Sequence, residues 1–363
     1  MQLIQPHLYA TTGFIDRVYK KEVEVMLKEM DRREFLKASA ATGAVLLAGN
    51  ILVQKTQASV LEEVDQVSFT ILIDNYVDVT LRSTPIVLRN RDRGIMAPLL
   101  SEHGLSILVE TTKKGQRNTY LMDGGYTRVG VPYNIEKMRL DLALVEAIYL
   151  SHNHVDHHTA MEDILKIIAK PTPVYIHPFA FNTKWIIYPK YKSGPHILNK
   201  EKLADLGARW QASEQPQRIA PHVLTAGTIS RTNDFEKIGP IFQYEMEEKL
   251  EKDEIWDDGA LIFNLKDKGL VVISACAHAG IVNTVHHAKA ITGIQKVYAV
   301  LGGFHLTGAP LPKVQRTIQE LRALGPKYLC PMHCTGFDTM VKFKEAFPEE
   351  YIISSVGTQI IFS

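Results

Sequence analysis

The stretch that decides the fold is Tyr149-Leu150-Ser151-His152-Asn153-His154-Val155-Asp156-His157-His158, where an apolar run ends in side chains that bind metals. In an extended segment, residues two apart point to the same side, so His152 and His154 can bind one cation together. Asp156 and His157 turn with the start of a helix and can bind a second cation. Imidazole and carboxylate groups suit Zn²⁺, Fe or Mn²⁺. A chance His-x-His-x-Asp-His would occur roughly once in a thousand sequences of this length, so the motif predicts a metal site.

Strand-like and helix-like runs alternate on both sides of this motif. In the first half we predict a helix over 160–169, with Thr159 as its N-cap, and strands over 68–73, 105–111, 119–122, 147–150 and 173–176. In the second half we predict a hairpin of 260–264 with 271–274, helices over 281–291, 312–324 and 338–346, and strands over 296–301, 328–330 and 359–362. Residues 180–250 are polar and show no clear hydrophobic period. We interpret this segment as an excursion, a stretch that leaves the sheets and passes over the face that carries the active site. Strands grouped in each half with helices outside predict an α/β fold, a four-layer αββα sandwich.

Further motifs extend this pattern along the chain. They are Leu121-Met122-Asp123-Gly124-Gly125, the run from Ser274 to Asn283 with Cys276 and His278, Gly302-Gly303-Phe304-His305-Leu306, and His333-Cys334-Thr335-Gly336. Together with the histidine motif and with 73–75 and 102–106, they resemble the metallo-β-lactamase superfamily. The resemblance is to the branch that includes an archaeal 7,8-dihydropterin-6-methyl-4-(ribofuranosyl)aminobenzene-phosphate synthase and exported bacterial relatives. It covers about residues 67–363.

The resemblance implies a pair of divalent metal ions, with zinc as the first expectation and iron or manganese as alternatives. It implies that His152, His154 and His278 bind one ion, and that Asp156, His157 and His333 bind the other. Asp123 would orient a histidine from behind. His305 could be a ligand, a proton donor or a substrate contact, and His177 a supporting or purely structural residue. We expect His158, His286 and His287 at the surface.

One position departs from the wider superfamily, in which many members bridge the two ions with an aspartate after a strand in the second half. This chain has Ala275-Cys276 there. Cys276 is either a thiolate ligand, since metals depress thiol pKa values, or a small buried apolar residue. With only Cys276, Cys330 and Cys334 in the chain, a disulfide framework is not expected.

Composition narrows the range of partners. The 363 residues are 45% hydrophobic and 22% charged, which is typical of a globular chain. The 41 basic and 40 acidic residues nearly balance. The chain therefore has no net electrostatic field that would favour binding to a nucleic acid or to an anionic membrane. We expect a small-molecule substrate instead.

The amino-terminal region resembles a twin-arginine export signal. Asp31-Arg32-Arg33-Glu34-Phe35-Leu36-Lys37 precedes a mild apolar run over 38–53 and then Thr56-Gln57-Ala58. Gly43, Gly49 and other small or polar residues interrupt that run, so a stable membrane span is not expected. We predict an N-terminal extension and signal over 1–58, cleavage after Ala58 and a folded domain over 59–363. Met30 could be the true start. Use of the twin-arginine machinery implies a periplasmic or otherwise exported protein, whereas a plain amphipathic helix here would leave it in the cytoplasm.

These observations predict a metal-dependent hydrolase that uses metal-bound hydroxide, acting on a phosphoester or a cyclic ester. Asp156 would hold the metal and steer the nucleophile, and His305 could donate a proton to the leaving group. A transferase resembling the synthase of this branch is the first alternative. A non-catalytic metal-binding protein is the second. The substrate preference is analogy, because a fold does not fix a function.

Overall fold

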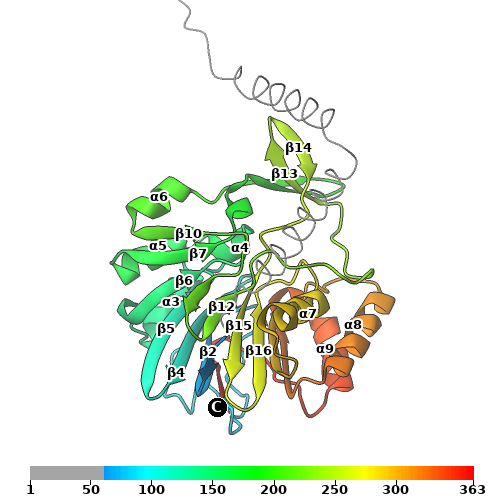
Figure 1. The fold of residues 1–363 in the computed structure, drawn as a ribbon. Coiled ribbons are helices and arrows are strands. Elements are labelled where there is room, and N and C mark those ends of the chain that lie inside the picture. The colour runs from blue at the N-terminus through cyan, green and yellow to red at the C-terminus, as the bar shows by residue number, and fades with distance from the viewer. Residues whose placement is uncertain (1–60) are drawn as a thin grey trace, which may run out of the picture. The chain divides into compact units, whose positions relative to one another are not determined.

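The computed structural model describes residues 61–363, which form two large β-sheets packed face to face with helices on their outer faces (Figure 1). The first sheet has eight strands. In spatial order they are β10 (Ala208–Ala212), β7 (Thr172–Ile176), β6 (Val145–Tyr149), β5 (Gln116–Met122), β4 (Ser106–Lys113), β2 (Gln66–Ile73), β19 (Gln359–Phe362) and β3 (Val87–Leu88). Strands β5, β6, β7 and β10 are parallel to one another, so their carboxyl ends meet at one edge.

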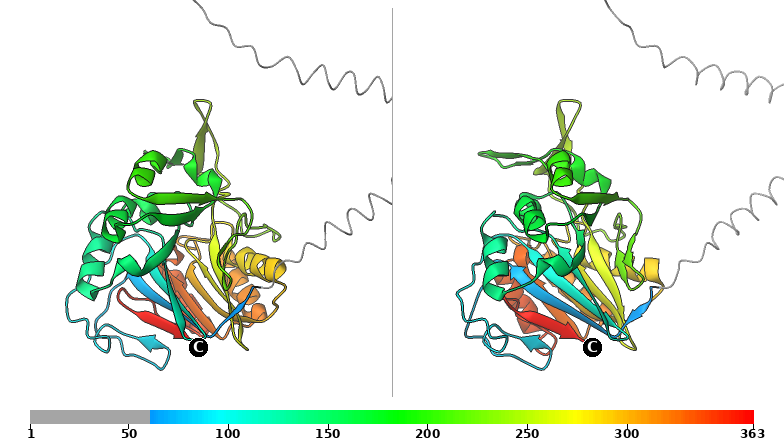
Figure 2. Two further views of the ribbon diagram at one scale, coloured as in Figure 1. Left: turned by 60° about the vertical axis from the view of Figure 1, so that its left-hand side comes forward. Right: turned by 90° about the vertical axis from the view of Figure 1, so that its left-hand side faces the viewer.

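The second sheet has seven strands. They are β11 (Arg218–Ala220), β12 (Val223–Thr225), β15 (Ala260–Leu265), β16 (Gly269–Ser274), β17 (Val297–Gly303) and β18 (Tyr328–Met332) in that order, with β1 (Glu63–Val64) paired to β15. Strands β16, β17 and β18 are parallel. A small third sheet contains β14 (Lys249–Lys252), β13 (Phe242–Met246), β8 (Lys184–Ile187) and β9 (Lys192–His196), and its β13–β14 hairpin projects from the body in both views of Figure 2.

Helices cover the outer face of each large sheet (Figure 1). Outside the first sheet lie α3 (Gly130–Met138), α5 (Met161–Ile168) and α6 (Lys200–Asp205), and outside the second lie α7 (Ile281–Thr292), α8 (Leu311–Leu324) and α9 (Phe337–Ala346). The short α4 (Val155–His158) and the 3₁₀ turns Leu142–Leu144, Pro178–Phe181 and His333–Thr335 complete the helical elements of this range. The predicted four-layer αββα sandwich is confirmed. Within residues 61–363, no helix has the length and apolar character needed to cross a membrane.

One hydrophobic cluster lies between the two sheets, and others lie beneath the helices. Side chains along each strand point alternately to the two faces of the sheet, so neighbouring residues contribute to different clusters. In β16, Val271 and Ile273 face the opposite sheet, while Leu270 and Val272 face the helix side. Both faces are therefore apolar, as expected of a strand buried on two sides. Phe69 of β2 packs edge-on against Phe263 of β15, with ring centroids 5.8 Å apart.

The structure differs from the sequence prediction in several places, and helix α3 was not predicted at all. Thr159 does not cap a helix: α5 begins at Met161, and the Thr159 hydroxyl donates to the carbonyl of Val155 at 2.6 Å. The strands are not fully segregated by half, since β19 joins the first sheet and β1 the second. The segment 180–250 contains the small sheet as well as β10, β11 and β12. The domain boundary predicted at Ala58 lies outside the described residues and stays a prediction.

Candidate metal centre

The predicted site residues follow the carboxyl ends of parallel strands in both large sheets. Asp123 follows β5, the histidine motif follows β6, Cys276 and His278 follow β16, and His305 and His333 follow β17 and β18. Parallel strands end at a common edge, so the topology brings residues far apart in sequence to one place. All six predicted metal ligands meet there, as the contacts below describe.

A hydrogen-bond chain behind the site fixes two of the imidazole rings. Asp123 is fully buried, and its Oδ2 lies 2.8 Å from Nδ1 of His157. The hydroxyl of Ser151 donates to the same oxygen at 2.7 Å and lies 2.9 Å from Nδ1 of His152. Because carboxylate oxygens only accept, His157 carries its proton on Nδ1, and the proton of His152 belongs on Nδ1 beside Ser151. Both Nε2 atoms are then lone-pair donors that point into the site.

The first group of donors consists of three buried histidines. Nε2 of His152 lies 3.0 Å from Nδ1 of His154, and the ring of His278 packs edge-on against both. Burial lowers the pKa of His154 to about 3 and holds the pKa values of His152 and His278 well below the usual value, so all three rings are neutral at pH 7. Neither ring nitrogen of His278 has a hydrogen-bond partner.

The second group surrounds Asp156. Its Oδ2 lies 3.3 Å from Nε2 of His333 and 3.6 Å from Nε2 of His157. Burial alone would raise the pKa of Asp156, but these two imidazoles hold it well below its usual value. His103, in the range 102–106 to which no role was assigned from the sequence, lies 3.5 Å from the same oxygen and stacks on His333. It is the exposed member of the group, with 62% of its side chain accessible.

The donor set fits a metal centre. Buried polar atoms are normally hydrogen-bonded, yet both ring nitrogens of His278 have no such partner, and Nε2 of His333 has only its ion-pair contact with Asp156. Neutral imidazoles with a carboxylate are the ligands that zinc and iron take. Among residues 61–363, two of the His/Cys/Asp/Glu groups close enough to hold an ion are His152–Cys276–His278 and His103–Asp156–His333.

Four buried aspartates hold the loops that carry these donors, each by accepting a backbone N–H. The pairs are Asp123 with Ser151 (2.8 Å), Asp257 with Asn153 (2.8 Å), Asp258 with Ala279 (2.9 Å) and Asp74 with His333 (3.0 Å). The consecutive Asp257 and Asp258 thus tie the histidine loop of the first sheet to that of the second. Sequence reasoning gave a role only to Asp123. For Asp257 and Asp258 the available signal was an acidic pair just before the apolar strand β15, separated from it by Gly259, whereas Asp74 follows the apolar strand β2.

A buried lysine joins the small sheet to this network. Lys184 of β8 is 1% exposed, contacts Oδ1 of Asp257 and lies 3.2 Å from Oδ2 of Asp253. Burial would raise the pKa of Asp257, and the Lys184 ammonium lowers it below its usual value. Phe242, on the neighbouring strand β13, stacks on His154 with ring centroids 5.3 Å apart. The excursion therefore covers the site, which agrees with its predicted position.

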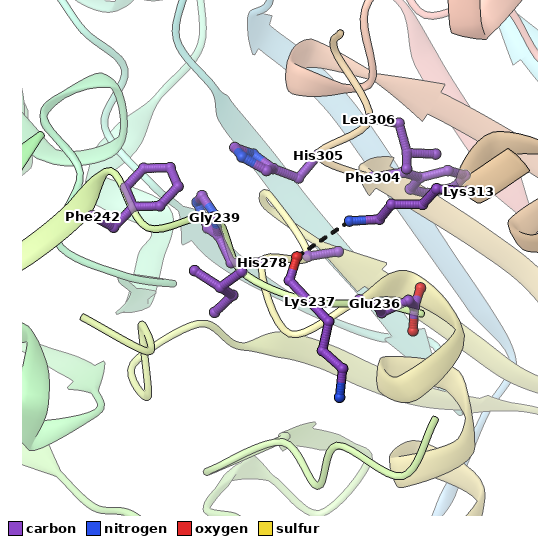
Figure 3. Close-up of a pocket in the computed structure, with 12 residues that line it drawn as sticks. Glu236, Lys237, Gly239, Phe242, His278, Phe304, His305, Leu306 and Lys313 are labelled. Atoms are coloured by element: carbon purple, nitrogen blue, oxygen red, sulfur yellow. Dashed lines mark hydrogen bonds between the residues drawn. The ribbon is translucent and has the colours of Figure 1, made fainter. Parts of the chain in front are cut away.

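A small pocket opens beside the first histidine group (Figure 3). His278, His305 and Phe242 form one end, and the ammonium of Lys313 at the other end donates to the carbonyl of Lys237 at 3.4 Å. The rings of His305 and His278 are 4.0 Å apart, and Nδ1 of His305 has no hydrogen-bond partner. His305 is thus placed both near the donors and at the pocket wall.

Of four further histidines outside the predicted ligand set, three are buried and one is exposed. His158 and His287 were expected at the surface but are each 8% exposed, and Nε2 of His287 lies 2.9 Å from the carbonyl of Ala226. His286 is exposed, as predicted. His177 caps a 3₁₀ turn by accepting from the N–H of Phe179, which is a structural role.

Comparison with known proteins identifies an export signal and two related archaeal proteins. Residues 29–49 match the family of the TAT (twin-arginine translocation) pathway signal sequence, so the predicted signal and exported location are confirmed. The chain is 35% identical over 274 residues to the 7,8-dihydropterin-6-methyl-4-(β-D-ribofuranosyl)-aminobenzene-5'-phosphate synthase of Methanocaldococcus jannaschii. That alignment covers 74% of this chain and 93% of the synthase. An uncharacterized protein of the same archaeon is 29% identical, over 71% of this chain and 92% of its own length.

A solved structure has the same fold. Tm1679, described as a metal-dependent hydrolase of the β-lactamase superfamily, superposes with a TM-score of 0.63 at 21% identity. The superposition covers 81% of this chain and 98% of Tm1679. At this identity the likeness establishes the architecture alone.

Proposed function

Because the chain belongs to the metallo-β-lactamase superfamily, in the branch of the dihydropterin–ribofuranosylaminobenzene phosphate synthase, we propose that it is an exported metal-dependent hydrolase with a pair of divalent ions. Its substrate would be a small phosphoester or cyclic ester. The observation that carries the proposal is the convergence of buried histidines at the strand ends, with both ring nitrogens of His278 lacking a hydrogen-bond partner, beside a small pocket.

His152, His154 and His278 would hold one ion, and Asp156, His157 and His333 the other. When bound, zinc, iron or manganese supplies Lewis-acid chemistry, lowering the pKa of water toward neutrality and polarising a phosphoryl or carbonyl oxygen. Asp123 keeps the proton of His157 on Nδ1, and Ser151 does the same for His152, so each ring presents a lone pair to the site.

The remaining residues would bind and orient the substrate. Phe242 closes the site on the side of His154 and excludes water from it. His305, at the boundary between donors and pocket, would hold a proton at Nδ1 and give it to the leaving group. Asp156 would orient the attacking water as well as bind the metal.

Metal content and hydrolysis test the proposal together. The full-length chain, purified without added metal, should contain about two equivalents of zinc, iron or manganese by elemental mass spectrometry, and should hydrolyse an activated phosphodiester or a lactone. Asp156→Ala should lose at least one equivalent and the activity. The control Asp163→Ala, which removes a surface carboxylate paired with Arg128, should change neither. Absence of metal even after reconstitution, or unchanged activity in Asp156→Ala, would refute the mechanism.

His305→Gln separates a proton donor from a ligand. If His305 donates a proton, the variant keeps its metal content and loses hydrolysis. If it is a ligand, metal content falls as well. The position of His305, beside His278 and at the pocket wall, is compatible with both roles, and the metal content of the variant decides between them.

Transfer rather than hydrolysis is the second candidate, because the alignment with the synthase covers 93% of that protein. The export signal favours hydrolysis, since it directs the chain out of the compartment in which phosphorylated pterin precursors are made. Incubation with a dihydropterin diphosphate and an aminobenzene riboside phosphate tests the transferase directly. Formation of the joined product would replace our proposal, whereas release of phosphate from a phosphoester alone would support it.

A further inference from the structure

Cys276 lies at the centre of the donor cluster. It follows strand β16, is 3% exposed, and its Sγ lies 3.2 Å from Nε2 of His157. Within residues 61–363, Cys276 belongs to a candidate group with His152 and His278 and also to one with His157 and His333. In each group the ligand atoms lie within 4.8 Å of one another. We propose that the Cys276 thiolate is a ligand shared by the two metal positions, an inference that rests on the metal centre of the proposed function.

The surroundings of the sulfur support this assignment. His278, in the first group, is 5% exposed and has no hydrogen-bond partner at either ring nitrogen. His333, in the second group, is 1% exposed, and its Nε2 has only the ion-pair contact with Asp156. The Asp123 contact leaves Nε2 of His157 as a lone pair facing Sγ. Ring nitrogens of both groups therefore lie within 4.8 Å of the sulfur. Cations held by the sulfur and these nitrogens would satisfy them, whereas a small apolar side chain at position 276 would supply no ligand atom.

The charges of the two groups also call for an anion at this position. The first group otherwise consists of neutral imidazoles, and Asp156 contacts only members of the second group. The thiol would lose its proton to solvent when metal binds, and the resulting negative charge would lie between two dications and reduce their repulsion. A thiolate ligand also favours zinc and iron over manganese, so the assignment narrows the choice of metal.

Cys334 provides a close control. Its sulfur shares a candidate group with Cys276 and His305 but with none of the other predicted ligands. Its Sγ donates to the carbonyl of Cys276 at 3.5 Å. A signal that arises from any thiol near the centre would respond to both cysteines, whereas a signal from the shared ligand would respond to Cys276 alone.

Cobalt substitution tests the assignment without an activity assay. The metal-free full-length chain would be titrated with Co²⁺, following bound metal and the near-ultraviolet thiolate-to-cobalt charge-transfer band. We expect two equivalents and a strong band in the wild type and in Cys334→Ser. In Cys276→Ser the band should vanish and at least one ion should bind about tenfold to a hundredfold more weakly. Cys276→Asp should bind two ions without the band, which keeps the test informative if the serine variant misfolds.

The possible failures are distinguishable. Two bound cobalt ions without a band in the wild type would overturn the role of Cys276 and leave the metal centre standing. A band that persists in Cys276→Ser, or that is lost only in Cys334→Ser, would overturn it too. A wild-type chain that binds no cobalt would overturn the proposed function, and this assignment with it.

Discussion

Replacing Lys184 with methionine should destabilise the protein by about 3–5 kcal/mol, because it leaves buried carboxylates without a counter-charge. The Lys184 side chain is 1% exposed, and those of Asp253 and Asp257 are 1% and 0% exposed. The ammonium contacts both, so its loss removes the only cation of this triad and leaves two anions together. Desolvated charges of this kind are costly unless paired.

A triple variant without charges at these three positions provides the matched comparison for Lys184→Met. Lys184→Met combined with Asp253→Asn and Asp257→Asn removes all three charges and keeps similar side-chain volumes. The asparagine carbonyl oxygen at position 257 can still accept the N–H of Asn153. Because a buried ion cluster can be replaced by neutral groups at little cost, the triple variant should recover most of the loss and lie within about 2 kcal/mol of the wild type.

Urea unfolding of the metal-free protein at pH 7, followed by circular dichroism, measures these free energies. Similar slopes against urea would show that the variants unfold the same structure. Lys249→Met, which removes an exposed lysine of β14, should stay within about 0.5 kcal/mol of the wild type. The reasoning is refuted if Lys184→Met lies within about 1 kcal/mol of the wild type, or if the triple variant is as unstable as the single one.

Three further outcomes are expected. Asp123→Asn should weaken metal binding about 10–100-fold in competition with a chelator, because its carboxylate orients two histidines; unchanged affinity would contradict this. Burial raises the pKa of Tyr120 to about 12, so between pH 10 and 12 the unfolded chain ionises first and stability falls as pH rises. The wild type should therefore lose about 1.4 kcal/mol per pH unit relative to Tyr120→Phe, whereas parallel stability curves would exclude it. Gly302→Ala should prevent folding, since its Cβ would lie 1.6 Å from the carbonyl of Ser274. Gly308→Ala, with open space around it, should cost only about 1 kcal/mol in thermal unfolding, and equal losses would refute the steric argument.

Most strands of the large sheets and helices α5, α7, α8 and α9 were predictable because their signals are local, whereas α3 was not predicted. The hairpin of β15 and β16 turns at Lys266-Asp267-Lys268-Gly269, and the alternation of Val271 and Ile273 with their neighbours follows from the pleat. The histidine motif itself predicted a metal site from its spacing, whereas His278 and His333 were added by the family resemblance, and the structure brings all of these side chains to one place. Helix caps were harder to predict. Thr159 has a side chain typical of an N-cap, but its hydroxyl donates to the carbonyl of Val155 in the preceding turn.

Long-range pairing accounts for what the sequence did not reveal. Lys184 reads as a surface residue, and only the distant Asp253 and Asp257 make its burial possible. From the sequence, His287 was expected at the surface, but in the structure its Nε2 lies beside the carbonyl of Ala226, which is distant in sequence. The strands of the small sheet are short and largely polar, so no apolar alternation in the sequence marks them.

The position of β19 has a consequence for the order in which the chain can fold during synthesis. This strand, at residues 359–362, lies between β2 and β3 in the first sheet, and Phe362 packs against Phe69, Tyr298 and Tyr328 from both sheets. The twin-arginine signal at residues 29–49 leaves the ribosome long before β19, the strand that completes this core. Since that pathway carries folded proteins, each chain must be held back from export until β19 has been released and inserted.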